Sequence, residues 1–226
     1  MIKFQNVTKT YPPNTTVLDN VSFEIKLGEF VSIVGKSGAG KTTLIRLLLG
    51  LEKPTSGQIF FNETDLLHRK HLQIQELRQK IGVIYQDYKL LSHKTVYENI
   101  AYVMAVKGEK DEKIIKEVAS VLEITGLSPK ANNFPDELSG GEKQRLAVAR
   151  AIVNQPDVIV ADEPTGNLDP YNSYEVVSIL NKFHGMGKTI ILASHDKEII
   201  NKLGKRVITL EDGKIIRDDK EGRFVL

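Results

Sequence analysis

The stretch from Gly35 to Thr43 constrains this chain more than any other. It matches the pattern G-x-x-x-x-G-K-[ST] and lies between an apolar run at 30–34 and another at 44–49, as expected of a strand, a loop and a helix. Glycines let successive backbone N–H groups turn inward around an anion, and the start of the helix adds its positive end. A plain glycine-rich turn is the alternative. The strand and helix on either side favour a triphosphate site.

Two side chains of this loop have a specific expected role. The Lys41 ammonium would reach the β- and γ-phosphates, and the Thr42 hydroxyl would take one coordination position on Mg²⁺. The loop therefore predicts the following nucleotide-binding residues: Gly35, Lys36, Ser37, Gly38, Ala39, Gly40, Lys41, Thr42 and Thr43.

Composition narrows the setting in which such a site works. Hydrophobic residues make up 41% and charged residues 27% of the chain, as in soluble globular proteins. No apolar run approaches the ~18 residues of a membrane span, the N-terminus lacks a signal-peptide pattern, and cysteine is absent. These features predict a cytoplasmic protein. A net charge of +2 does not indicate a nucleic-acid partner.

Apolar patterning predicts an α/β fold in one domain, 1–226, with three parts. Residues 1–86 would hold an N-terminal antiparallel β element (2–7 with 17–25) and the phosphate loop, and residues 87–154 an inserted helical subdomain. Residues 155–226 would complete the core sheet. The further strands expected are 58–61, 81–85, 158–161, 189–193 and a hairpin of 206–210 with 214–217. The further helices expected are 72–80, 95–106, 113–124, 138–153 and 171–184.

Two carboxylates follow the β-branched run 158–161. Asp162 is placed to hold a metal ion opposite the Thr42 hydroxyl. Glu163 would face the water that attacks the γ-phosphate, because successive side chains that leave a strand point apart. An acidic pair after a strand is common in α/β proteins, so the pair gains its meaning from the phosphate loop.

A second phosphate receptor is expected at Ser139-Gly140-Gly141. These residues open a predicted helix, so bare N–H groups and a positive helix end meet there again. One triphosphate cannot easily fill both receptors within one chain if the second lies in a separate subdomain. A homodimer that shares its sites is the economical explanation.

Taken together, these residues resemble the ATP-binding cassette family over essentially the whole chain. The loop at 35–42 resembles its Walker A motif, Gln86 its Q-loop, and Leu138–Glu142 its signature motif. The run 158–163 resembles Walker B, and the D-loop and switch histidine would follow at Asn167–Asp169 and His195. Six motifs in the right order are far more specific than any one of them.

The resemblance implies a P-loop NTPase (RecA-like) core and a Mg-dependent ATPase whose two copies meet head to tail. Each ATP would lie between the Walker A of one copy and the signature of the other. The roles that the resemblance implies are adenine stacking for Tyr11, sensing of Mg²⁺ and the γ-phosphate for Gln86, and communication between the two sites for Asp169. Glu163 would polarise the attacking water and His195 would contact the γ-phosphate. The expected catalytic residues are therefore Glu163, His195, Lys41 and Gln86. The signature would add Ser139, Gly140, Gly141 and Glu142 to the nucleotide contacts. The expected metal ligands are Thr42, Gln86 and Asp162.

Within that family the chain is similar to ATPase subunits of bacterial cell-division complexes, through the stretches 86–91, 95–100 and 133–138. That similarity implies a polytopic membrane partner of the FtsX type and a peripheral place on the inner face of the cell membrane. Two alternatives stay open. One is the ATPase of a lipoprotein-release or macrolide-efflux complex, which shares the stretch 161–169 more or less intact. The other is a soluble, nucleic-acid-linked cassette protein. The apolar residues after Gln86, namely Tyr88, Leu90 and Leu91, either pack beneath the helical subdomain or line a groove for a partner helix.

Overall fold

The computed structural model of the chain describes residues 1–62, 64–66 and 71–224. Its strands are β1 (Ile2–Tyr11), β2 (Thr15–Ile25), β3 (Phe30–Val34), β4 (Ser56–Phe61), β5 (Thr64–Asp65), β6 (Ile81–Tyr85), β7 (Val158–Asp162), β8 (Thr189–Ser194), β9 (Arg206–Glu211) and β10 (Lys214–Asp219). Its helices are α1 (Lys41–Leu48), α2 (His71–Gln79), α3 (Val96–Val106), α4 (Asp111–Ile124), α5 (Gly140–Ile152), α6 (Pro170–Gly185), α7 (Lys197–Leu203) and two short 3₁₀ turns, Ser128–Lys130 and Pro135–Glu137.

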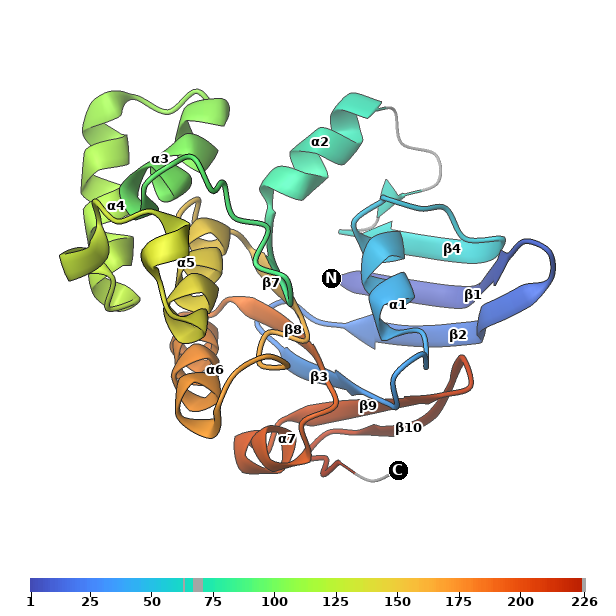
Figure 1. The fold of residues 1–226 in the computed structure, drawn as a ribbon. Coiled ribbons are helices and arrows are strands. Elements are labelled where there is room, and N and C mark those ends of the chain that lie inside the picture. Colours follow the sequence, from blue (N-terminus) through green and yellow to red (C-terminus); the bar gives the residue numbers. More distant parts are fainter. Residues whose placement is uncertain (63, 67–70, 225–226) are drawn as a thin grey trace.

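A six-stranded sheet in the order β10-β9-β3-β8-β7-β6 runs through the middle of the molecule (Figure 1). Strands β9, β3, β8, β7 and β6 pair in parallel, and β10 pairs antiparallel with β9. Strands β7 and β8 are buried at every position, as expected of strands that are covered on both faces. Because the carboxyl ends of parallel strands meet at one edge, the residues after β3, β6, β7 and β8 gather there.

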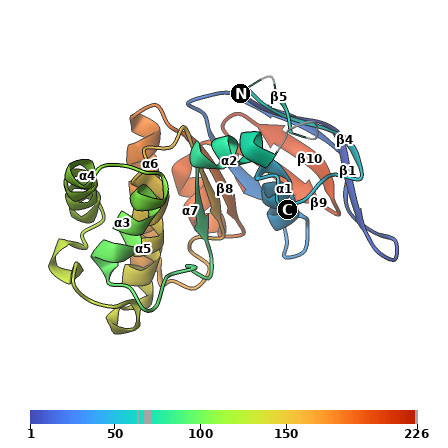
Figure 2. The same ribbon diagram turned by 90° about the horizontal axis from the view of Figure 1, so that it is seen from above.

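Two hydrophobic cores lie on opposite faces of this sheet, and strand alternation divides the side chains between them. In β3, Val31 and Ile33 belong to the core that includes α1 and the second sheet, in the order β2-β1-β4-β5. Phe30 and Val34 belong to the other core, with the helices α3 to α6. Helix α1 therefore lies between the two sheets, as the view in Figure 2 also shows.

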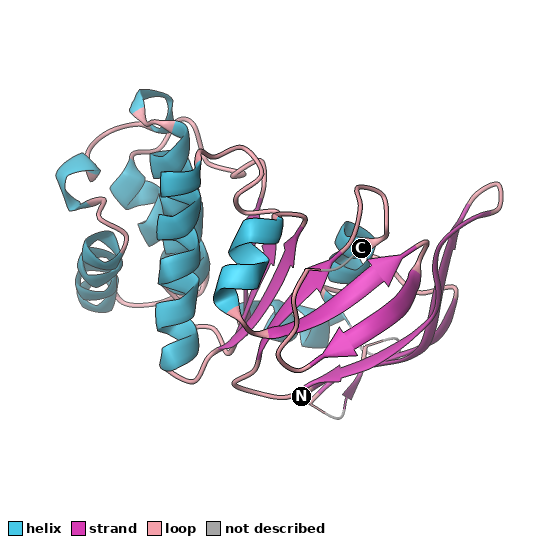
Figure 3. Ribbon diagram, turned by 90° about the horizontal axis from the view of Figure 1, so that it is seen from below, coloured by secondary structure: helices cyan, strands magenta, loops and turns pink. Residues whose placement is uncertain are grey.

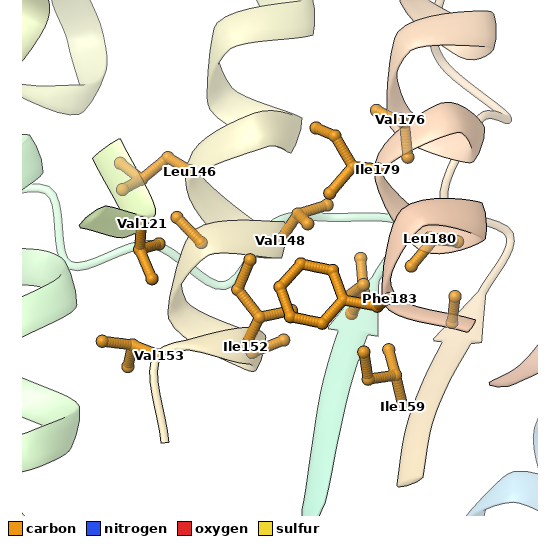
Figure 4. Close-up of a cluster of buried hydrophobic side chains, with 14 of the residues drawn as sticks. Val121, Leu146, Val148, Ile152, Val153, Ile159, Val176, Ile179, Leu180 and Phe183 are labelled. Carbon is orange, nitrogen blue, oxygen red and sulfur yellow. The ribbon is translucent and has the colours of Figure 1, made fainter. Parts of the chain in front are cut away.

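Helices α3 to α6 gather on the opposite side of the central sheet (Figure 3), whereas Leu77 of α2 belongs to the core that includes α1. Helices α3, α4 and α5 pack on one another, and α5 also packs on α6. Figure 4 shows the packing between α5, α6 and the central sheet: Ile152 of α5, Phe183 of α6 and Ile159 of β7 point toward one another inside one buried cluster. Helix α5 is thus packed firmly on α6. No helix among the described residues is both long and apolar enough to cross a membrane.

Local signals explain why most element boundaries agree with expectation. Thr95 and Ser139 begin α3 and α5 with reciprocal capping boxes, and Asp169 caps α6. The expected β6 matches the observed strand, and the hairpin forms as β9 and β10. Helix α7 was not expected, because seven residues between Asp196 and Gly204 are too few to show a helical period.

Asn99 anchors the connection between β6 and α3. Its Oδ1 accepts from the Leu91 amide at 2.9 Å, and its Nδ2 donates to the carbonyls of Leu91, Lys94 and Thr95 at 2.9 to 3.0 Å. The side chain is fully buried. It supplies the partners that this loop's backbone lacks.

We expect Asn99→Ala to lower the free energy of unfolding by about 3 kcal/mol, because buried backbone groups lose their partners. Chemical denaturation measures the change. The exposed Asn181 on α6 is the matched control, and its alanine variant should stay within about 0.5 kcal/mol of the wild type. Equal stability of the two variants would contradict the assignment.

Candidate functional site

A cleft of about 750 Å³ opens where the parallel strands end. It brings together the loop after β3, Gln86 after β6, Glu163 after β7 and His195 after β8. Residues that were expected from four separate stretches of sequence therefore share one space. Val17 of β2 and Phe224 near the C-terminus line the cleft as well.

The phosphate loop has the backbone that its glycines predict. Gly38 and Gly40 have φ of 82° and 105°, in the left-handed region that side chains rarely enter. Gly35 packs so closely on the Leu210 carbonyl that a Cβ there would overlap it. Helix α1 begins directly after Gly40, so its unpaired N–H groups stand at the loop. A phosphate is the ligand that such a cradle suits.

Asp162 and Thr42 lie together, as the metal-site hypothesis requires. The Thr42 hydroxyl donates to Asp162 Oδ1 at 3.2 Å, and the carboxylate is only 8% exposed. Burial raises the pKa of Asp162, and the hydrogen bond from Thr42 partly opposes this shift. Hydroxyl, carboxylate and the nearby Gln86 amide are oxygen donors of the kind that Mg²⁺ prefers. Among the described residues, no group of three or more His, Cys, Asp or Glu side chains is arranged so that it could hold a metal ion.

Glu163 turns away from Asp162 and joins two other residues. Its backbone has a φ of 49°, an uncommon value for a residue other than glycine and one that is often found at functional sites. Its Oε1 lies 3.2 Å from Lys41 Nζ, and its Oε2 lies 2.8 Å from His195 Nδ1. Lys41 also donates to the Gly35 and Lys36 carbonyls at 2.8 and 3.2 Å. The loop lysine is therefore satisfied internally.

The signature residues lie outside this cleft. Ser139 Oγ accepts from the Glu142 amide at 3.3 Å, while Glu142 Oε2 accepts from the Ser139 amide at 2.8 Å. The backbone hydrogen bond from Ser139 lowers the pKa of Glu142. Gly140 is exposed, and none of the four residues Ser139–Glu142 lines the cleft of its own chain. Asp169 is exposed too, and it caps α6 through the Tyr171 and Asn172 amides.

Tyr11 lies before the turn that joins β1 to β2. It is the last residue of β1 and is half-buried, because its hydroxyl donates to Glu52 at 2.5 Å and Lys9 Nζ lies 4.9 Å from its ring centroid. The turn begins one residue later. Stacking of Tyr11 on adenine stays a prediction, since Tyr11 does not line the cleft. Val17 and Phe224 were missed because an apolar residue at a rim carries no motif.

Comparison with known proteins decides the family. The family model described as ABC transporter matches residues 18–166. This chain belongs to the ABC transporter family. Curated relatives include cell division ATP-binding protein FtsE of Bacillus subtilis, 50% identical over 99% of this chain and 98% of the relative. FtsE of Mycobacterium tuberculosis is 44% identical over 99% of this chain and 98% of the relative. FtsE of Escherichia coli K12 is 41% identical over 95% of this chain and 97% of the relative.

Solved structures agree with this family. A dimer of the ATP-binding cassette MJ0796 in a post-hydrolysis state, bound to ADP and Pi, has a TM-score of 0.90 and 35% identity, over 99% of this chain and 100% of that chain. The cassette CbiO1 of Clostridium perfringens has a TM-score of 0.89 and 31% identity, over 97% of this chain and 88% of that chain. The expected P-loop NTPase fold is confirmed, and the chain is an ABC ATPase.

The raised pKa of Asp162 predicts that the stability of this ABC ATPase depends on pH. A raised carboxyl pKa means that the folded state holds the proton more tightly than the unfolded state, so stability falls as pH rises from the ordinary aspartate range through the raised pKa. Asp162→Asn removes the ionisable group. We expect the variant to melt at a higher temperature than the nucleotide-free wild type at neutral pH, and the difference to shrink as pH falls toward 4. Differential scanning fluorimetry across pH measures this, and a difference that is constant with pH would contradict it.

Proposed function

We propose that this chain is the ATP-binding and ATP-hydrolysing subunit of an FtsE-type complex. Two copies would close on ATP and pass the motion to a polytopic membrane protein of the FtsX type, in cell division and the control of cell-wall hydrolases. The chain would act at the cytoplasmic face of the membrane through that partner. One observation carries the proposal: the cleft brings together the phosphate loop, Gln86, Glu163 and His195, while the signature segment lies outside it with Gly140, the first residue of α5, exposed.

The dimer would supply the missing wall of the cleft. The N–H groups at Gly140 and Gly141 head α5 in one copy and would meet the phosphates held by the loop of the second copy, with Ser139 and Glu142 beside them. The similarity to cassettes whose structures are described as dimeric supports this arrangement. Asp169, exposed at the start of α6, would link the two sites.

The same residues suggest the order of events in the cleft. An arriving triphosphate would compete with Glu163 for Lys41, and the displaced Glu163 would be free to orient the attacking water, with His195 and Gln86 on the γ-phosphate. A Mg²⁺ ion bound by Thr42, Asp162 and Gln86 would offset phosphate charge. Tyr11, at the end of β1, would stack on the adenine, as the family resemblance implies.

Glu163→Gln tests this assignment. The variant should lose nearly all hydrolysis, since an amide cannot orient water as a base, and should remain a dimer with Mg-ATP. It should also bind Mg-ATP about five times more tightly, because an ion pair worth roughly 1 kcal/mol no longer competes for Lys41. Calorimetric titration measures affinity, and light scattering measures the dimer. Wild-type turnover by Glu163→Gln would show that Glu163 does not orient the attacking water.

A groove of about 340 Å³ is the proposed docking place for the membrane partner. It is lined by the segment after Gln86, by α3 and by α5, including Tyr88, Val106 and Arg150. Within the described residues its charged lining is all basic, namely Arg78, Lys89, Lys107 and Arg150. Arg150 Nε and Asn154 Oδ1 are buried without a hydrogen-bond partner. A helix end that carries a carboxylate would complement this groove. Of the three apolar residues after Gln86, Tyr88 lines it, and Leu90 packs on the core.

We expect Val106→Asp to reduce recovery of the partner at least tenfold, because a desolvated carboxylate would replace an apolar side chain that is 70% exposed on α3. The partner is recovered from detergent-solubilised membranes and identified by mass spectrometry. Ile115→Asp, at a 60% exposed apolar position on α4, is the matched control and should keep the partner. ATP hydrolysis by the isolated subunit should stay unchanged in both. If both variants lost the partner equally, the proposed docking groove would be wrong.

The recovered protein also separates the alternatives. An FtsX-like protein supports the cell-division function that the FtsE relatives favour. A lipoprotein-release or macrolide-efflux permease would favour a transporter complex instead. Recovery of no membrane protein, together with a salt-sensitive gel shift on DNA or RNA, would favour the nucleic-acid-linked class.

A further inference from the structure

Asn172 connects the D-loop to the signature helix within one chain. Its Nδ2 donates to Asp169 Oδ2, and its Oδ1 accepts from Arg145 Nη1 at 3.1 Å. Arg145 lies on α5, and Asn172 lies in the first turn of α6. An arginine can only donate and a carboxylate can only accept, so the two neighbours fix the orientation of the amide. Neither an aspartate nor a leucine at this position can make both contacts.

The backbone of the signature is equally close to Asn172. A Cβ built on Gly141 would overlap Oδ1 and Cγ of Asn172. Asn172 cannot move aside without breaking its bonds to Asp169 and Arg145. The absence of a side chain at Gly141 therefore serves the contact with α6, in addition to any contact with phosphate.

The contact is reinforced on both sides. Arg145 Nη1 also donates to Glu175 Oε2 at 2.5 Å, one turn further along α6. Below it, α5 and α6 share the buried cluster of Figure 4, which includes Val148, Ile152 and Phe183. Leu168 of the D-loop lies beside Gly140, with its Cδ2 4.0 Å from where a Cβ would stand. The signature and the D-loop are thus joined by polar and apolar contacts.

We propose that Asn172 is a positioning residue that fixes Asp169 of the D-loop to the signature segment, so that both present themselves to the second copy as one rigid unit. The inference rests on the proposed dimer, because the unit belongs to the half of each site that the other copy supplies. Asn172 does not line the cleft of its own chain. Its loss therefore weakens hydrolysis at the partner's nucleotide and leaves its own copy's nucleotide binding intact.

Asn172→Leu tests this, since leucine keeps the branched shape and removes both hydrogen bonds. Mg-ATP affinity of the monomer should stay within about twofold of the wild type, while kcat falls about tenfold or more. Asn172→Ala serves as the second variant if leucine impairs folding. A loss of monomer affinity beyond about tenfold would overturn the proposal, because Asn172 would then act on the cleft of its own chain.

Mixing two defective variants gives the decisive readout. A dimer of one Glu163→Gln copy and one Asn172→Leu copy has one intact site, made of the loop and Glu163 of the second copy and the signature of the first. The mixture should hydrolyse ATP several-fold faster than the sum of the separate variants. A residue that served only folding would show no such gain.

The control mixture pairs Glu163→Gln with Ser139→Arg, a change in the signature itself. If the control mixture gains activity and the Asn172→Leu mixture does not, the positioning role is wrong and the composite site stands. If neither mixture gains, the composite dimer site is wrong, and the role of Asn172 falls with it.

Discussion

The parallel pairing of β3, β8, β7 and β6 is the constraint on which the site depends. These strands end at the same edge, so the phosphate loop, Gln86, Glu163 and His195 lie in one cleft although more than 150 residues separate Gly35 from His195. Strand β8 stands between β3 and β7, and Thr42 still reaches Asp162 across its end. Any change in strand order would scatter these groups.

Much of this arrangement could be read from the sequence because it is encoded locally. Glycines set the loop, β-branched runs set the buried strands, and cap residues such as Thr95 and Ser139 set helix starts. The carboxylate pair was correctly expected to diverge, with Asp162 on Thr42. What the sequence did not give was any contact between distant side chains that follows no motif.

Tyr11, Val17 and Asn172 are examples of that second kind. The Tyr11 hydroxyl donates to Glu52, a residue 41 positions away. Val17 lines the cleft because β2 lies against Gly40 of the phosphate loop. Asn172 looks like an ordinary polar residue in the first turn of a helix, and its importance depends on Gly141 and Arg145 of another helix. Packing between elements, and not propensity within them, decides these positions.

The internal satisfaction of Lys41 has a structural meaning as well. An ammonium that is only 6% exposed would be costly without partners, and Glu163 with two loop carbonyls supplies them. The loop can therefore keep its shape without a phosphate present. In the proposed mechanism, nucleotide binding exchanges one set of Lys41 partners for another and does not require the site to fold.

The capping box at Ser139 has a similar consequence for the opposite half of the site. The Ser139 hydroxyl oxygen accepts a hydrogen bond from the Glu142 amide. This bond uses one lone pair of the oxygen and leaves the hydroxyl proton free to be donated. The helix cap therefore holds the oxygen in place at no cost to its ability to donate. A side chain that is already immobilised loses little rotamer entropy when it binds an anion, so in the proposed dimer Ser139 would contact phosphate at a low entropic cost.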